Sequence, residues 1–186
     1  MLIASFAKPI GMFDNFFNKA VAWATNGDFC HSEFIFTYTS EEFENIINDI
    51  EGHTFLKEKF KQYVENDKIN ICFYVIWGDT VSYRLLKKTH NNPFYRMPNA
   101  SQFKTVELET TNEQEEKMFS FLLNQCGKFY DYKAALAYWL PWRSSMPEYP
   151  KYFCSQLMLT TLHQIQLYRE FNPASTTPNE LYKILT

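Results

Sequence analysis

The stretch "KYFCSQLMLTTLH", residues 151–163, joins a cysteine to an apolar helical pattern. Met158, Thr161 and Ile165 lie four, seven and eleven residues after Cys154, so they share one helix face with it. In the first turn of such a helix, unpaired N–H groups and the helix dipole favour the thiolate, which is the nucleophilic form. Free cysteine is also among the most buried residue types, so a core residue is the alternative.

The composition indicates one folded domain over residues 1–186 and argues against a nucleic-acid partner. Hydrophobic residues make up 46% of the chain, which predicts a packed core rather than disorder. The net charge of −3 lacks the excess of basic residues that nucleic-acid binding requires, so we expect no nucleic-acid partner. Aromatic residues reach 18%, through either codon bias or a functional demand.

The four cysteines, at positions 30, 72, 126 and 154, form no CxxC pair and no zinc-ligand spacing. We therefore expect no zinc site and no disulfide framework, and free thiols in a reducing, cytoplasmic compartment. The first residues lack the basic start and apolar run of a signal peptide, and no stretch is long and apolar enough to span a membrane.

Strand patterns lie mostly early in the chain and helix patterns mostly late, which predicts an α+β fold with helices packed against an antiparallel sheet. Strands are predicted at residues 1–7, 29–39, 69–77 and 103–111, and residues 80–88 either extend the third or form another. Helices are predicted at residues 11–27, 40–50, 110–127, 130–142 and 153–170 and from residue 178, with residues 51–66 helical or loop.

A nucleophilic cysteine needs a base, and three of the four histidines are poor candidates. His163 lies nine residues after Cys154, on the opposite side of the predicted helix. His53 and His90 lie in turn-like sequence and are expected to be solvated.

His31, the fourth histidine, opens a predicted strand and shares one strand face with Glu33. If buried, the two side chains must find polar partners. An imidazole at this position could take the proton of Cys154, while an acceptor fixes its tautomer. The alternative is an edge strand on which both face water. Cys30, the rival nucleophile, points to the opposite face from His31.

Four segments occur in an order and spacing that match one family: "ATNGDFCHSEFIF" at 24–36, "GKFYDY" at 127–132, "FCSQL" at 153–157 and "TTPNELYKIL" at 176–185. The chain resembles the circularly permuted papain-like thiol hydrolases of the NlpC-type amidase superfamily, which includes lecithin–retinol-acyltransferase-like proteins. In this branch the histidine strand precedes the cysteine helix. Residues 40–68 have no counterpart in the family and are a candidate insertion.

The resemblance implies a permuted papain-like fold in which Cys154 is the nucleophile and His31 the general base. Glu33 matches the family's His-x-Glu pattern. However, two positions along a strand separate side-chain bases by roughly 6–7 Å. Glu33 could therefore order the site or the substrate rather than hold the imidazole directly. In that case a polar group on a neighbouring strand would hold the imidazole.

The resemblance also implies three substrate-binding candidates near the start of the catalytic helix. Tyr130 and Asp131 would shape the cleft, and the alternative for them is a turn with a capping aspartate. Gln156 occupies a position where the family also has glutamate.

By the same resemblance, the activity is thiol-dependent acyl transfer from an amide or ester through a thioester, and it implies no metal and no cofactor. The implied substrates are a small peptide, an amino-acid amide or an acyl lipid. Intracellular members include proteins of large DNA viruses, which would place the chain in the host cytoplasm or the virion. Two alternatives are an inactive binding module of the same fold, and an acyltransferase or phospholipase working at a membrane surface. In the latter, Tyr138, Trp139, Trp142 and Tyr149 would insert at the interface.

Overall fold

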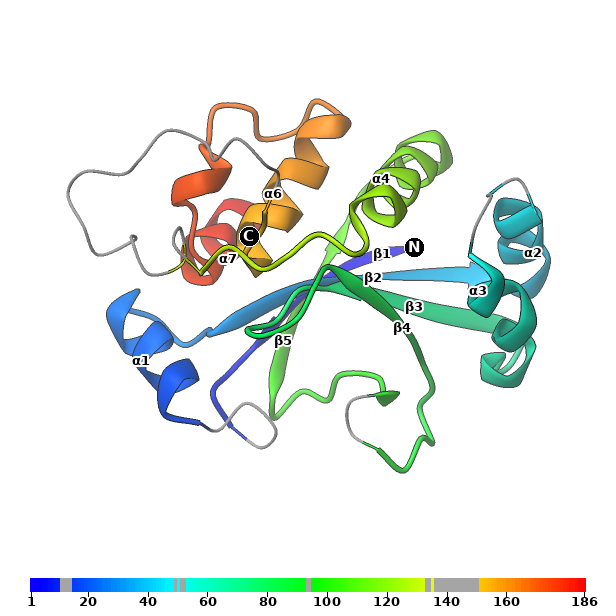
Figure 1. Cartoon of the computed structure of the whole chain (residues 1–186), viewed down its shortest axis with the longest axis horizontal. Helices are drawn as coiled ribbons and strands as arrows, with labels where there is room; N and C mark the ends of the chain where they lie inside the picture. Colours follow the sequence, from blue (N-terminus) through cyan, green and yellow to red (C-terminus); the bar gives the residue numbers. More distant parts are fainter. Residues whose placement is uncertain (11–14, 49, 51–52, 93–94, 133–134, 136–150) are drawn as a thin grey trace.

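The structure, a computed structural model, describes all residues except 11–14, 49, 51–52, 93–94, 133–134 and 136–150 (Figure 1). Five runs of apolar, aromatic and β-branched residues form one antiparallel sheet in the order β4-β3-β2-β1-β5. The strands are β1 (Leu2–Ala7), β2 (His31–Thr39), β3 (Lys68–Tyr74), β4 (Ser82–Leu86) and β5 (Phe103–Leu108). The predicted α+β class is confirmed, and residues 80–88 contain a separate strand.

Helices cover one face of the sheet and lie at its two ends (Figure 1). Helices α4, α6 and α7 lie over the face, whereas α1 lies at one end and α2 and α3 at the other. None of the described helices is long and apolar enough to cross a membrane. The helical segments are α1 (Phe16–Ala24), α2 (Ser40–Asn48), α3 (Thr54–Lys59), η2 (Phe60–Tyr63), α4 (Asn112–Gln125), α6 (Cys154–Gln164), η4 (Pro173–Ser175) and α7 (Pro178–Leu185).

Strand β2 contributes to a core on each face of the sheet. Phe34 and Phe36 belong to the main core, which also contains the apolar residues of α4 and α6. Ile35 points the other way and packs with Cys72 and Leu86 in a smaller cluster. Because side chains alternate along a strand, His31 and Glu33 belong to the smaller-cluster face.

One predicted helix is shorter in the structure, and another lies mostly outside the described residues. The helix expected over residues 153–170 ends at Gln164, because Gln166 and Tyr168 adopt positive φ angles of 66° and 57° that a right-handed helix excludes. The helix expected over residues 130–142 falls mostly outside the described residues. So do the four aromatic residues assigned to membrane contact, Tyr138, Trp139, Trp142 and Tyr149.

Candidate functional site

The first two residues of β2 have a neighbouring strand on one side only. Strand β1 pairs with β2 from His31 onward, whereas β3 pairs with it only from Phe34, because β3 ends at Tyr74. Among the described residues, His31 and Ser32 therefore have no strand neighbour on the β3 side. Cys154 occupies this position, because the backbone N–H of Ser32 hydrogen-bonds it.

Cys154 is the first residue of α6 and follows the N-cap residue Phe153. Its side chain is buried, with the residue 7% exposed. Burial alone would raise the pKa of Cys154. A hydrogen bond to His31, the charge of His31, and hydrogen bonds from the backbone and hydroxyl of Ser32 outweigh burial and lower it. The prediction that this thiol lies in the first turn of a helix is confirmed.

His31 contacts both Cys154 and Glu33, which an imidazole can do because it has two ring nitrogens. Its Nε2 lies 3.5 Å from Glu33 Oε2. Burial would lower the pKa of His31, but hydrogen bonds to Cys154 and Glu33 raise it to about 9. The two side chains thus converge even though their strand positions are two apart. The two shifts, down for the Cys154 thiol and up for the His31 imidazole, both favour a thiolate beside an imidazolium.

Arg84, on β4, completes the site, and the sequence analysis did not predict its role. It reaches across β3, and its Nη2 donates to Glu33 Oε2 at 2.7 Å. Its guanidinium lies 4.6 Å from the ring centre of Tyr74. Burial would raise the pKa of Glu33, but the charge of Arg84 and the hydrogen bond to His31 lower it to about 2. The only signal in the sequence was an arginine inside the apolar strand sequence "SYRLL".

Acidic and basic side chains alternate in the buried site. The thiol of Cys154, the imidazole of His31, the carboxylate of Glu33 and the guanidinium of Arg84 follow one another. Isolated buried charges are costly, and pairing each with an opposite charge reduces that cost. The arrangement lowers the pKa of the Cys154 thiol, which favours its nucleophilic form.

The other three cysteines lack this environment. Burial raises the pKa of Cys30 and of Cys126 to about 12, and that of Cys72 well above its ordinary value. The Cys30 thiol donates to the Ala7 carbonyl at 3.4 Å. Cys154 is thus the one cysteine of the four whose pKa is lowered.

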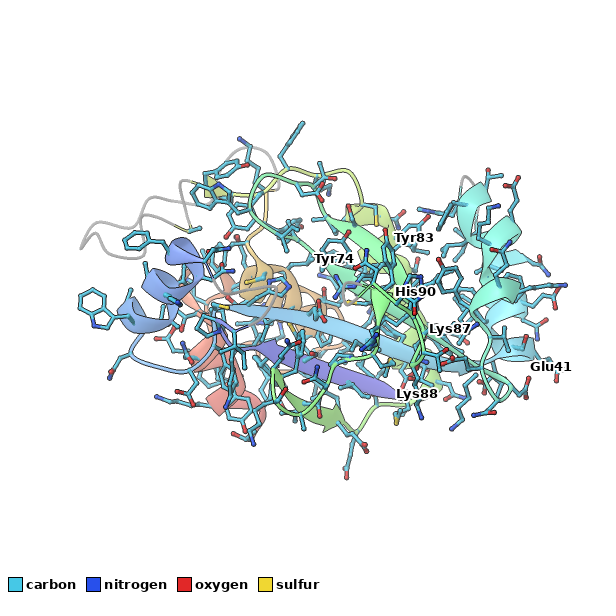
Figure 2. All side chains as sticks on the ribbon, turned by 90° about the horizontal axis from the view of Figure 1, so that it is seen from below. Glu41, Tyr74, Tyr83, Lys87, Lys88 and His90 are labelled. Atoms are coloured by element: carbon cyan, nitrogen blue, oxygen red, sulfur yellow. The ribbon has the colours of Figure 1, made fainter. Side chains whose placement is uncertain are left out.

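The other three histidines are engaged elsewhere. His90 lies beside Lys87 and Lys88 after β4, away from α6 (Figure 2). His53 is half-buried rather than fully solvated. Their contacts are His53 with the Tyr83 ring at 5.8 Å between centres, His90 with the Tyr63 ring at 6.3 Å, and His163 Nε2 with the Tyr168 carbonyl at 3.0 Å.

The three substrate-binding candidates have different surroundings. Tyr130 is buried close to the thiol: burial and then the charge of Cys154 raise the pKa of Tyr130. Asp131 is also buried, and its backbone N–H donates to the Tyr152 carbonyl at 3.0 Å. The side chain of Gln156 instead caps its own helix, because its Oε1 accepts from the Phe153 N–H at 3.3 Å.

The segment leading into α7 ties together the two elements that carry Cys154 and His31. Asn179 accepts from the Phe29 N–H at 2.9 Å and donates to the Phe29 carbonyl at 3.0 Å, two residues before His31. Ser155 Oγ donates to the Thr176 carbonyl at 2.7 Å, next to Cys154. These bonds hold the start of α6 near the start of β2.

Comparison with known protein families, characterised proteins and solved structures found no match to the chain. Within the described ranges, no group of three or more histidine, cysteine, aspartate or glutamate side chains could hold a metal ion. The structure thus places a cysteine beside a histidine that a carboxylate contacts.

Proposed function

We propose that the protein is a cysteine-dependent hydrolase or acyltransferase with a permuted papain-like fold, acting on an amide or ester bond. One observation carries the proposal: a cysteine at a helix N-terminus is hydrogen-bonded to a buried histidine, and a glutamate paired with Arg84 supports that histidine. A purely structural cysteine gains nothing from these polar neighbours, which are costly to bury.

In the proposed reaction, the Cys154 thiolate attacks the substrate carbonyl and forms a carbon–sulfur bond. The His31 imidazolium gives its proton to the leaving amine or alcohol as the carbon–nitrogen or carbon–oxygen bond breaks, which leaves a thioester. Water or another acceptor then attacks the thioester and loses its proton to His31. Cys154 leaves as the thiolate, which restores the starting pair.

The start of α6 supplies donors for the oxyanion of the tetrahedral intermediate. The first backbone N–H groups of a helix have no partner within the helix, and the backbone N–H of Cys154 is one of them. Such donors stabilise charge that develops in the transition state. Glu33 and Arg84 act as positioning residues, because Glu33 contacts the imidazole of His31 and Arg84 contacts Glu33.

An exposed aromatic surface beside the site favours an acyl lipid as a second candidate substrate. Trp77 and Phe129 are 45% and 67% exposed. The Trp77 ring centre lies 4.6 Å from that of Tyr132 and 5.7 Å from that of Tyr130, which lies close to Cys154. Exposed aromatic groups of this kind can bind an apolar chain as well as a peptide side chain.

Acyl-enzyme trapping tests the proposal. The protein is mixed with p-nitrophenyl esters of short and long acyl chains and with amino-acid p-nitroanilides, and intact mass and peptide mapping locate any adduct. We expect a burst of nitrophenol or nitroaniline and an acyl group on Cys154. Cys154→Ser and His31→Ala should abolish both, whereas the matched Cys126→Ser control should react normally.

A preference for long acyl chains would favour the lipid substrate, and reaction with the anilides the amide substrate. If no substrate gives turnover or an adduct that depends on Cys154, the protein is an inactive module and the proposal is wrong.

A further inference from the structure

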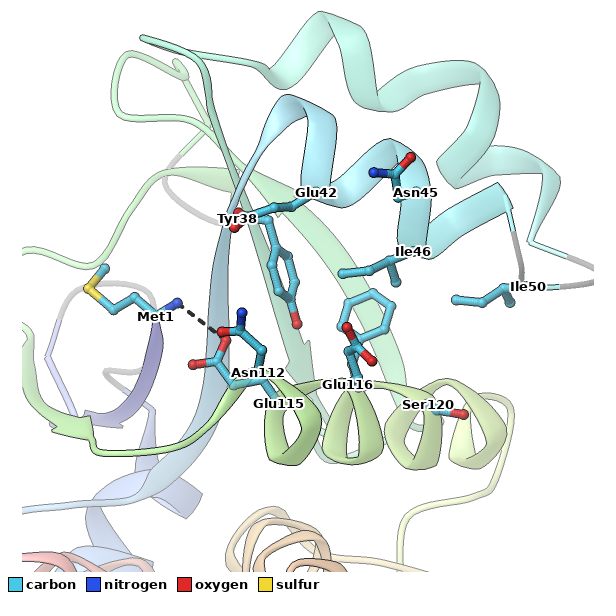
Figure 3. Close-up of a pocket in the computed structure, with 11 residues that line it drawn as sticks. Met1, Tyr38, Glu42, Asn45, Ile46, Ile50, Asn112, Glu115, Glu116 and Ser120 are labelled. Carbon is cyan, nitrogen blue, oxygen red and sulfur yellow. Dashed lines mark hydrogen bonds and ion pairs between the residues drawn. The ribbon is translucent and has the colours of Figure 1, made fainter.

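A cavity of about 460 Å³ lies between α2 and α4, at the end of β2 away from Cys154 (Figure 3). Tyr38 lines it, seven residues after His31 on the same strand. At about 3.3 Å per strand residue, the cavity lies roughly 23 Å from the cysteine site. Helix α2 belongs to residues 40–68, the segment to which the proposed acyl-transfer function assigns no role.

Three carboxylates give the cavity a negative charge. Glu42 comes from the first turn of α2, and Glu115 and Glu116 come from the first turns of α4. The amino group of Met1, 3.2 Å from Glu115 Oε2, is the one positive charge among the described residues that line the cavity, which include no lysine or arginine. Two negative charges thus remain without a cation among the residues that line the cavity.

The Tyr38 hydroxyl is an independent observation that points to a ligand in this cavity. Tyr38 is 7% exposed, and its hydroxyl has no hydrogen-bond partner in the part of the chain that the structure describes. Figure 3 shows the hydroxyl pointing toward the first turns of α4. Burial, and then the charges of Glu115, Glu116 and Glu42, raise the pKa of Tyr38, so its hydroxyl stays neutral. A buried hydroxyl without a partner is costly, and a cationic donor would satisfy it.

Apolar side chains separate the charged groups. Ile46 and Ile50 of the α2 side and Phe119 of α4 line the same cavity. Such a lining matches a ligand in which ammonium groups alternate with methylene segments.

We propose that this cavity binds a linear aliphatic polyamine. Its ammonium groups lie against Glu42 and Glu116 and donate to Tyr38, while its methylene groups pack on Ile46 and Phe119. The site is separate from the acyl-transfer proposal, and neither depends on the other.

Calorimetric titration of the full chain tests the site, with spermidine and cadaverine as probes. Pentylamine and the uncharged pentanediol are the ligand controls. We expect both polyamines to bind, pentylamine to bind more weakly and pentanediol not at all, and added salt to weaken binding because the attraction is between charges.

Variants locate the binding. Tyr38→Phe removes only the hydroxyl and should weaken spermidine binding by about tenfold, as loss of a hydrogen bond to a charged group does. The exposed Glu116→Gln should also weaken it and keeps the test open if the tyrosine variant does not fold. Glu113→Gln, an exposed acid one turn away that does not line the cavity, should bind normally.

Three results would overturn the proposal: no heat of binding at millimolar polyamine, equal binding of pentanediol, or equal losses in Glu116→Gln and Glu113→Gln. The last would show that the surface charge of α4, and not the cavity, attracts the ligand.

Discussion

Replacing Glu33 with glutamine should make the Cys154 thiol less reactive, although the two side chains do not touch in the proposed reaction. The amide of Glu33→Gln keeps the shape and an oxygen that can accept from Arg84, but it removes the negative charge beside His31. The imidazolium then loses one of its two supports, and the thiolate loses part of the positive charge that stabilises it.

The size of the effect follows from the pKa of His31. Its rise from 6.5 to about 9 corresponds to about 3 kcal/mol, since each pKa unit corresponds to about 1.4 kcal/mol. Cys154 and Glu33 are the two groups that raise it. Because burial acts against these two groups, together they raise the pKa of His31 by more than the net change. Loss of about 1 pKa unit at His31 corresponds to about 1.4 kcal/mol, so Glu33→Gln should slow Cys154 alkylation at neutral pH by roughly tenfold.

The assay is alkylation by iodoacetamide as a function of pH, with each cysteine followed by mass spectrometry. Cys30, Cys72 and Cys126 are internal references, since burial raises their pKa values. Glu107→Gln on the exposed side of β5 is the matched control and should leave the profile unchanged.

Glu33→Gln also leaves the guanidinium of Arg84 buried without its carboxylate, which is expected to cost about 3–5 kcal/mol of stability. The double variant Glu33→Gln/Arg84→Met removes that charge and should recover part of the loss. If folded Glu33→Gln gives the wild-type alkylation profile, the carboxylate does not support the imidazolium. If wild-type Cys154 reacts only after unfolding, it is a core residue and the catalytic interpretation is wrong.

Two further results are expected from the same structure. The pKa of Glu33 is held at about 2, against an ordinary value of 4.5. The resulting stabilisation of roughly 3 kcal/mol is therefore present above pH 4.5 and is lost as the pH falls toward 2. Urea unfolding should show this loss in the wild type but not in Glu33→Gln/Arg84→Met, and equal acid sensitivity of the two proteins would contradict it. Gly27→Ala would place a Cβ against Asn179 Oδ1 and displace the side chain that holds Phe29, so we expect a loss of about 1–3 kcal/mol in thermal unfolding together with slower Cys154 alkylation. Gly127→Ala is the control: its Cβ meets no atom but its φ of 85° strains alanine, so it should lose about 1 kcal/mol of stability without slowing Cys154 alkylation.

The sequence alone predicted the helix start at Cys154, the strand that carries His31, and the α+β class. These features are local: they depend on the 3.6-residue and two-residue periodicities of apolar side chains and on the residue types that begin and end helices. The end of α6 was placed six residues too far along. Nothing in the residue types at Gln166 and Tyr168 requires a positive φ, and both adopt one.

The tertiary structure alone decided which polar groups meet. Arg84 reaches Glu33 because β3 lies between their strands in register, and Cys154 reaches Ser32 because β3 ends too early to cover the start of β2. Asn179 meets Phe29 across 150 residues of chain. A sequence specifies which residues must be buried through local periodicity, but the partner of a buried charge depends on strand order and register. Those are set by the packing of the whole chain.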